Sequence, residues 1–210
     1  MSSRLGRLTH ALEIASSSKR PLRWLGVFVV GAATAGLIVV WERSMGFGSP
    51  VFAFNLHFTL MAAAVLVDKL LAPQLDSRRF RVSPREVEIY RRLGVVGFMH
   101  LLRKIGWTAA MRDRKVFDGT RSTVSSYERA TRHGENAHAV LFLIVLAPLA
   151  WALVEGWWSA AFWIGSMNLV FHAYPVMLQR VQRVRLLAIL RRLERRSGEP
   201  SAAKRPSSAP

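Results

Sequence analysis

The chain contains no cysteine in its 210 residues. This absence excludes a disulfide framework, a cysteine-based zinc site and a cysteine nucleophile. Acidic residues are also scarce, because 13 Asp and Glu stand against 30 Lys and Arg and leave a net charge of +17. Neither a Walker-type phosphate loop nor a nucleic-acid-binding motif accompanies this charge. The positive excess therefore predicts contact with anionic lipid headgroups and no nucleic-acid partner.

Apolar residues are abundant, with 51% of the chain hydrophobic and a mean hydropathy of +0.19. Four segments carry no charged residue, and each has about the length of a helix that crosses the roughly 30 Å core of a bilayer. The pattern predicts an all-α integral membrane protein with about four transmembrane helices. A cleaved signal peptide is the alternative for the first segment, but that segment exceeds the usual apolar region of about 7–15 residues. The four segments, of 18, 17, 16 and 23 residues, are Trp24–Trp41, Val51–Val67, Ala139–Val154 and Trp157–Gln179.

The charged residues are concentrated between these segments. Residues 1–23, 68–138 and 179–210 carry net charges of +4, +7 and +7, whereas the short links 42–50 and 155–156 together carry −1. Four crossings place all three basic segments on one side of the membrane. The positive-inside rule then predicts a multi-pass protein of the cell (inner, cytoplasmic) membrane with both termini in the cytoplasm.

The same division predicts five parts, of which the middle one is an amphipathic segment on the cytoplasmic face. In chain order they are a basic cytoplasmic arm at 1–20, a transmembrane hairpin at 21–72, the amphipathic segment at 73–124, a second transmembrane hairpin with a polar site and a basic helix at 125–196, and a disordered tail at 197–210.

Local signals predict where several helices begin and bend. Ser83 before Pro84 is typical of a helix start, and Gly94 and Gly97 weaken the continuity of the helix that follows. The spacing Ser125-x-x-Glu128 resembles a capping box and predicts the start of the helix that enters the third span. Prolines at 148 and 175 predict kinks in the third and fourth spans.

Polar side chains inside the predicted spans are the candidate functional residues, because ionisable groups at membrane depth are costly. Helical spacing places one set on a single face of the third span and a second set on a single face of the fourth, both toward the cytoplasmic side. Antiparallel packing of the two spans would let His172 approach His138. The two sets are Thr131, Glu135 and His138, and Asn168, His172 and Gln179.

Glu135 lies three residues before His138, so a hydrogen bond between them could fix the imidazole tautomer and raise its basicity for general acid–base work. A polar pair that only holds two helices together explains the spacing as well. A second Glu-x-x-His pair is missing, so no metal site is predicted. His57, near the outer end of the second span, is expected to lie at the membrane interface. Arginines that flank the polar sets either contact headgroups or bind the phosphates of a donor such as coenzyme A.

Two short blocks resemble a known family. The first is Thr131, Arg132, Glu135 and His138; the second, after a hydrophobic hairpin, is Pro175, Gln179, Arg180, Arg183, Arg185 and Leu186. In order and spacing they resemble the glycosyl-4,4′-diaponeurosporenoate acyltransferases of the staphyloxanthin carotenoid pathway, over roughly residues 85–196.

The resemblance implies a membrane enzyme that esterifies a sugar hydroxyl of a glycosylated terpenoid with a fatty acyl group. The polar faces, together with the resemblance, predict a catalytic set in which His138 is the general base, Glu135 orients it, His172 lies nearby, and Asn168 or Gln179 donates to the oxyanion. Membrane lipids and a lipid-like glycosylated acceptor are the expected partners. No bound cofactor is expected, with acyl-CoA or a similar acyl donor as co-substrate. The residues expected to bind substrate or donor are Thr131, Arg132, Gln179, Arg180, Arg183 and Arg185.

Two other classes use the same residues. A non-catalytic membrane scaffold would use Glu135 and His138 for helix packing. A small transporter subunit would use Glu135, His138 and His172 as a proton path. Loss of acyl transfer in His138→Ala distinguishes the enzyme from the scaffold, and flux in proteoliposomes identifies the transporter.

Overall fold

The computed structural model describes residues 20–75, 77–107 and 120–198, and within these ranges it contains helices and no strand. Four helical stretches are long and apolar enough to cross a membrane. The all-α prediction with four such helices is therefore confirmed. The predicted arm at 1–20 and tail at 197–210 fall almost wholly outside the described residues. The four stretches are Arg20–Met45, Pro50–Leu71, Ser122–Val154 and Trp158–Arg195.

The chain divides into two compact units. Unit 1 comprises Met1–Gln74 and Ala137–Ala173, and unit 2 comprises Leu75–Asn136 and Tyr174–Pro210. The five-part division made from the sequence follows the expected course through a membrane and stays a prediction.

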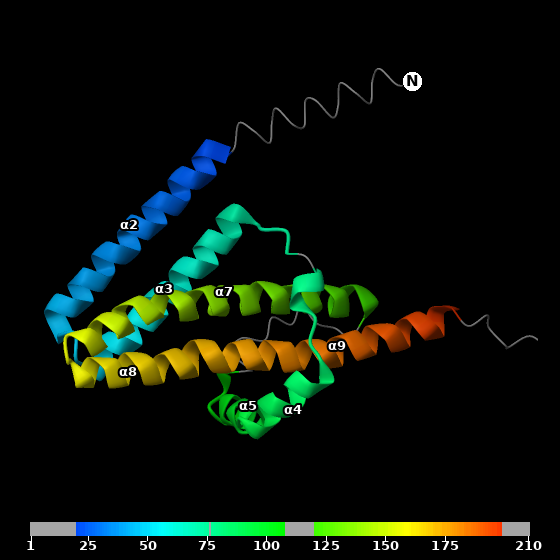
Figure 1. Ribbon diagram of the computed structural model, residues 1–210. Helices are drawn as coiled ribbons and strands as arrows, with labels where there is room; N and C mark the ends of the chain where they lie inside the picture. Colours follow the sequence, from blue (N-terminus) through cyan, green and yellow to red (C-terminus); the bar gives the residue numbers. More distant parts are fainter. Residues whose placement is uncertain (1–19, 76, 108–119, 199–210) are drawn as a thin grey trace, which may run out of the picture. The chain divides into compact units, whose positions relative to one another are not determined.

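In unit 1, helices α2 (Arg20–Met45) and α3 (Pro50–Leu71) form a hairpin (Figure 1). The Ser49 hydroxyl accepts from the backbone N–H of Val51, and a proline occupies the first turn, where its missing N–H costs nothing. Trp41 Nε1 donates to Thr59 Oγ1 across 3.2 Å and ties the two helices together.

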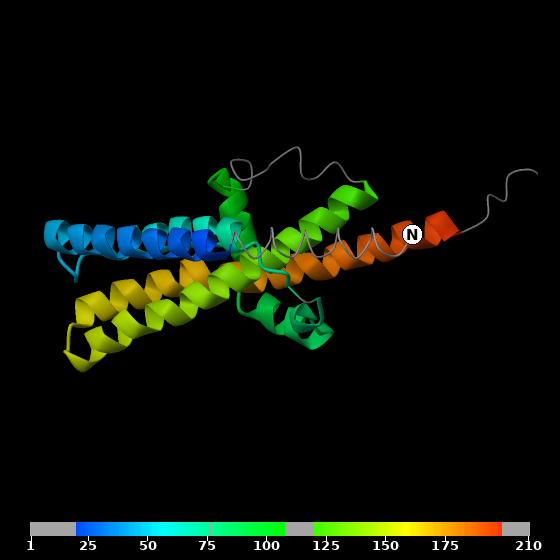
Figure 2. The same cartoon turned by 90° about the horizontal axis from the view of Figure 1, so that it is seen from above.

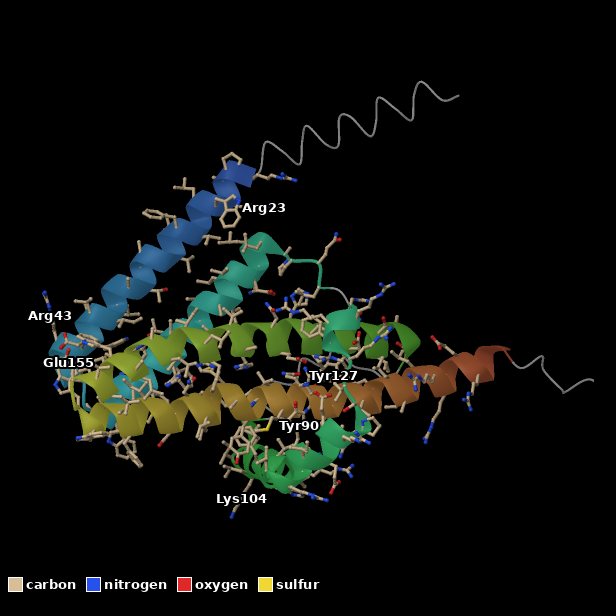
Figure 3. The ribbon with its side chains drawn as sticks, viewed as in Figure 1. Arg23, Arg43, Tyr90, Lys104, Tyr127 and Glu155 are labelled. Carbon is tan, nitrogen blue, oxygen red and sulfur yellow. The ribbon has the colours of Figure 1, made fainter. Side chains whose placement is uncertain are left out.

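The rest of unit 1 is the second half of α7 (Arg121–Val154), helix α8 (Trp158–Asn168) and a π-helical turn, η2 (Leu169–Ala173). The second half of α7 and α8 run side by side in opposite directions (Figure 2). Ser159 Oγ donates to Gly48 O at 2.9 Å, so the two interhelical turns of this unit meet. In Figure 3, Arg43 and Glu155, the charges of these turns, lie at the same end of the unit. Its core consists of Phe52, Ala53, Leu56, Val145, Ala152, Ala160, Ala161 and Ile164.

Unit 2 contains a 3₁₀ turn, η1 (Ser77–Phe80), two short helices, α4 (Pro84–Arg92) and α5 (Val95–Lys104), the first half of α7, and α9 (Tyr174–Gly198). The helix start predicted at Ser83 is confirmed, because Ser83 and Glu86 form a complete capping box. The break predicted at Gly94 is confirmed too, since its φ of +85° is left-handed and suits glycine.

The capping box predicted at Ser125 is wrong, because α7 begins at Arg121. The Thr120 hydroxyl accepts from the backbone N–H of Thr123, and Val124 N donates to Thr120 O, so the first turn closes before Ser125. The Ser125 hydroxyl instead accepts from Arg129 one turn later, at 2.9 Å. The Thr120 hydroxyl therefore caps this helix, one turn before the predicted start.

Proline has different effects at the two predicted kinks. Helix α7 continues through Pro148. The fourth span changes its winding before Pro175, at the π-helical turn η2. Proline has no N–H to donate to the preceding turn, and single π-turns of this kind recur at functional sites. A π-turn that holds His172 therefore precedes Pro175, and the kink itself stays a prediction.

Candidate functional site

Three histidines of unit 1 form a hydrogen-bonded row. His57 Nδ1 lies 2.9 Å from His172 Nε2, and His138 Nδ1 lies 3.4 Å from His172 Nδ1. The other nitrogen of His57 lies 3.3 Å from the backbone carbonyl of Ile164 in α8. The row therefore runs from a carbonyl through two inner rings to His138, with His172 in the middle.

Burial differs along this row. His57 and His172 are fully buried, both at 0% exposure, whereas His138 is half-buried. The ring of Phe171 packs beside the inner pair, with its centroid 5.8 Å from that of His57, and Phe54 and Phe58 pack against Phe171 in turn. His138 is thus the most exposed member of the row.

The π-turn positions the middle ring. His172 lies within η2, and the centroid of its ring lies 5.7 Å from that of the His138 ring. A π-turn adds one residue to the helical turn and rotates the following side chains relative to an unbroken α-helix. The approach of His172 to His138 that the sequence predicted is confirmed by the 3.4 Å separation.

Asn168 is buried, at 2% exposure, on the last residue of α8. Its Nδ2 donates to the Phe142 carbonyl in α7 across 3.3 Å. Its Oδ1 is buried with no hydrogen-bond partner among the described residues. A buried polar atom without a partner is unusual, so this oxygen is a candidate acceptor for a bound hydroxyl.

Unit 2 holds a separate polar cluster centred on Arg183, whose side chain is 1% exposed. Arg183 donates to Glu135 Oε2 at 2.5 Å, to Thr131 Oγ1 at 3.1 Å and to the Phe80 carbonyl at 3.0 Å. Its guanidinium carbon also lies 5.2 Å from the centre of the Phe80 ring, in cation–π range. Thr131 and Arg183, both predicted to bind substrate or donor, are thus brought together with Glu135, which was predicted as a catalytic residue.

Two further arginines complete this cluster. Arg180 donates to the other oxygen of Glu135 at 2.6 Å and to Glu86 Oε1 at 2.9 Å. Arg132 pairs with Glu128 and donates to the Leu75 carbonyl at 3.2 Å. Buried charges need such pairing, so the cluster ties α4, α7 and α9 together.

The electrostatics of α4 follow from these contacts. The Ser83 backbone N–H, and then Arg180, lower the pKa of Glu86 against the opposing effect of burial. Burial raises the pKa of the Tyr90 phenol, the labelled residue of α4 in Figure 3.

The cluster gives most of the predicted donor-binding residues an internal partner. Gln179 lies over Gly134, where an added Cβ would come within 2.9 Å of its Nε2. Arg185 is exposed on α9. The hydrogen bond predicted between Glu135 and His138 joins residues of different units and stays a prediction.

His57 is the residue that the sequence reasoning undervalued. Counting residues from the ends of each span placed it at the outer interface and His172 toward the cytoplasmic side, whereas the two rings are in contact and fully buried. An ionisable residue inside an apolar run was the available signal. Glu128 was read as part of a helix cap, whereas it pairs with Arg132. Glu86, which completes the capping box at Ser83, also pairs with Arg180.

Among the described residues, no group of three or more His, Asp or Glu side chains is arranged to hold a metal ion. A family model described as glycosyl-4,4'-diaponeurosporenoate acyltransferase matches residues 73–192, which is more than half of the chain. No curated protein and no solved structure matches the chain. The matched range includes His138, His172 and the Arg183 cluster, and it begins after His57.

Proposed function

The chain belongs to the glycosyl-4,4'-diaponeurosporenoate acyltransferase family, and from this we propose that it moves a fatty acyl group onto a hydroxyl of a glycosylated terpenoid, carotenoid or related lipid. Membership makes it an acyltransferase of the carotenoid pathway, and its four apolar helices indicate a membrane protein. The family match over residues 73–192 is the observation that carries the proposal. It also favours an enzyme over the scaffold and the transporter.

His138 is the general base in this proposal. Its half-buried ring takes the proton of the acceptor hydroxyl while the hydroxyl oxygen attacks the acyl carbonyl carbon of a thioester donor. The tetrahedral intermediate collapses, the carbon–sulfur bond breaks, and the imidazolium returns the proton to the leaving thiolate. The products are the ester and a free thiol, and His138 ends neutral, as a base that works in every turnover requires.

Asn168 supports the acceptor side of this reaction. Its Nδ2 is engaged by the Phe142 carbonyl, and an amide nitrogen carries a second hydrogen that could serve the oxyanion. Its free Oδ1 is suited to a sugar hydroxyl. Gln179, the second predicted oxyanion donor, belongs to unit 2 and keeps that role only as a prediction.

Donor binding is assigned by chemistry. The donor is acyl-CoA or a similar thioester, whose phosphates suit arginine. Arg132, Arg180 and Arg183 already neutralise carboxylates, so their first role is to hold unit 2 together. Arg185, exposed on α9, is the member of the predicted set left for phosphate.

The proposal includes a location. The charge bias places the protein in the cell (cytoplasmic) membrane with both termini in the cytoplasm, where an acyl donor such as acyl-CoA is available.

The test is acyl transfer in cells that make a glycosylated terpenoid acid. Lipid extracts with and without the gene should differ by an acylated glycolipid, and His138→Ala should abolish that product while the protein still inserts. His100→Ala, which changes an exposed histidine on α5, is the matched control and should leave the product unchanged. Persistent product in His138→Ala overturns the base assignment, and no product from the wild type overturns the function.

A further inference from the structure

The histidine row has a direction set by one backbone carbonyl. The Ile164 carbonyl can only accept, so the His57 nitrogen that faces it, Nε2, must carry the hydrogen. In a neutral ring the other nitrogen, Nδ1, is then an acceptor, and it lies 2.9 Å from His172 Nε2. His172 therefore carries its hydrogen on Nε2 and presents a bare Nδ1.

The same reasoning reaches His138. A bare Nδ1 on His172 needs a donor opposite, and the atom 3.4 Å away is His138 Nδ1. His138 then carries its hydrogen on Nδ1, which leaves Nε2 as the unprotonated nitrogen. Full burial of His57 and His172 favours neutral rings, because a buried charge without a counter-ion is costly.

We propose that His57 is a positioning residue for acyl transfer, which acts through His172 to hold His138 in the tautomer whose Nε2 is free to take the hydroxyl proton. The inference rests on the proposed function and extends it to a residue of α3, which lies outside the matched residues 73–192. A base in the wrong tautomer has its hydrogen where its lone pair is needed, and a positioned general base contributes roughly 10²–10⁴-fold to a rate.

The test compares two substitutions at one position. His57→Phe keeps an aromatic ring but removes the acceptor for His172 Nε2–H, so kcat should fall at least about tenfold with KM unchanged. His57→Asn places a carbonyl oxygen near the former Nδ1 and should keep kcat close to the wild-type value. Leu56→Ala, a buried neighbour without polar atoms, should lower thermal stability without this selective loss of kcat. Full-length protein in membranes is assayed with glycosyl-4,4'-diaponeurosporenoate and a fatty acyl-CoA.

A second readout does not require activity. Nitrogen NMR of ¹⁵N-histidine-labelled protein should show the His138 proton on Nδ1 in the wild type and a mixture of tautomers in His57→Phe. Wild-type kcat in His57→Phe, or a wild-type His138 proton on Nε2, overturns the inference. If His57→Phe fails to insert into the membrane, the tautomer of His138 in the wild type and in His57→Asn decides whether the inference holds. If the wild type is inactive, the proposed function is contradicted, and the NMR result still tests the tautomers of the histidine row.

Discussion

Arg183 Nη1 donates to Glu135 Oε2 across 2.5 Å, and the Arg183 side chain is 1% exposed. Glu135 is also buried, at 5% exposure, and its second oxygen accepts from Arg180. One buried carboxylate thus binds two guanidinium groups, with Glu128 lying 3.8 Å from the first of them. The balance of charges holds only while every member is present, because a buried charge that loses its partner is strongly destabilising.

Arg183→Met should therefore lower the free energy of unfolding by about 3–5 kcal/mol. Thermal unfolding of the purified protein in detergent measures the change. Arg185→Met removes an exposed arginine two residues away on α9 and should change stability by about 0.5 kcal/mol or less. Equal unfolding temperatures for the two variants would contradict the role of the cluster.

The Glu86 carboxylate should contribute stability that depends on pH. Its folded pKa lies below its ordinary value of 4.5, so the contribution is fully present above pH 4.5 and is lost as the pH falls through the folded value. Glu86→Gln should thus be less stable than the wild type at neutral pH, and the difference should vanish in acid. Unfolding curves at several pH values measure this. Glu88→Gln, whose partner Arg92 is exposed, is the control and should show a smaller difference. A difference in stability between the wild type and Glu86→Gln that does not change with pH would contradict this role of the Glu86 carboxylate.

Substitution of alanine for two glycines, Gly94 and Gly97, should change the free energy of unfolding in opposite directions. Gly94 has a φ of +85° between α4 and α5, and the nearest atom to an added Cβ is Tyr174 Oη at 3.8 Å, so only backbone strain opposes the change. Gly94→Ala should cost about 1–2 kcal/mol. Gly97 lies inside α5 with nothing within 4 Å, and Gly97→Ala should stabilise by about 0.5–1 kcal/mol. Chemical or thermal unfolding measures both changes. Stability changes in the same direction at both positions would contradict this prediction.

The absence of cysteine makes topology directly measurable. Ser44→Cys and Glu155→Cys lie in the short links 42–50 and 155–156 that are expected outside. Arg85→Cys and Arg195→Cys lie in segments expected in the cytoplasm. An impermeant maleimide should label the first two in intact cells and the second two only after lysis, while the unmodified chain stays unlabelled. Labelling of Arg85→Cys in intact cells would show that the predicted orientation in the membrane is reversed.

Local features of the fold were predictable because their causes are local. Charge-free runs long enough to cross a bilayer predicted the four helices, and Ser83 and Gly94 predicted a helix start and a break from their own backbone preferences. The Ser125 error came from the same reasoning, since the spacing Ser125-x-x-Glu128 does not reveal that the helix has already begun one turn earlier, at Thr120. Pro175 indicated an irregular part of the fourth span, but the missing N–H of proline can be accommodated either by a kink or by a π-turn.

The sequence by itself determined that this chain is helical, apolar in four stretches and basic between them, and it pointed to His138 and His172 through their cost in a membrane. The tertiary structure decided their partners. His57 and His172 are 115 residues apart, and Arg183 and Glu135 are 48 apart. Such pairings depend on how helices cross and rotate against one another, which spacing along a single helix does not specify. The burial of His57 against His172, in place of an exposed position at an outer interface, therefore follows from the packing of the helices.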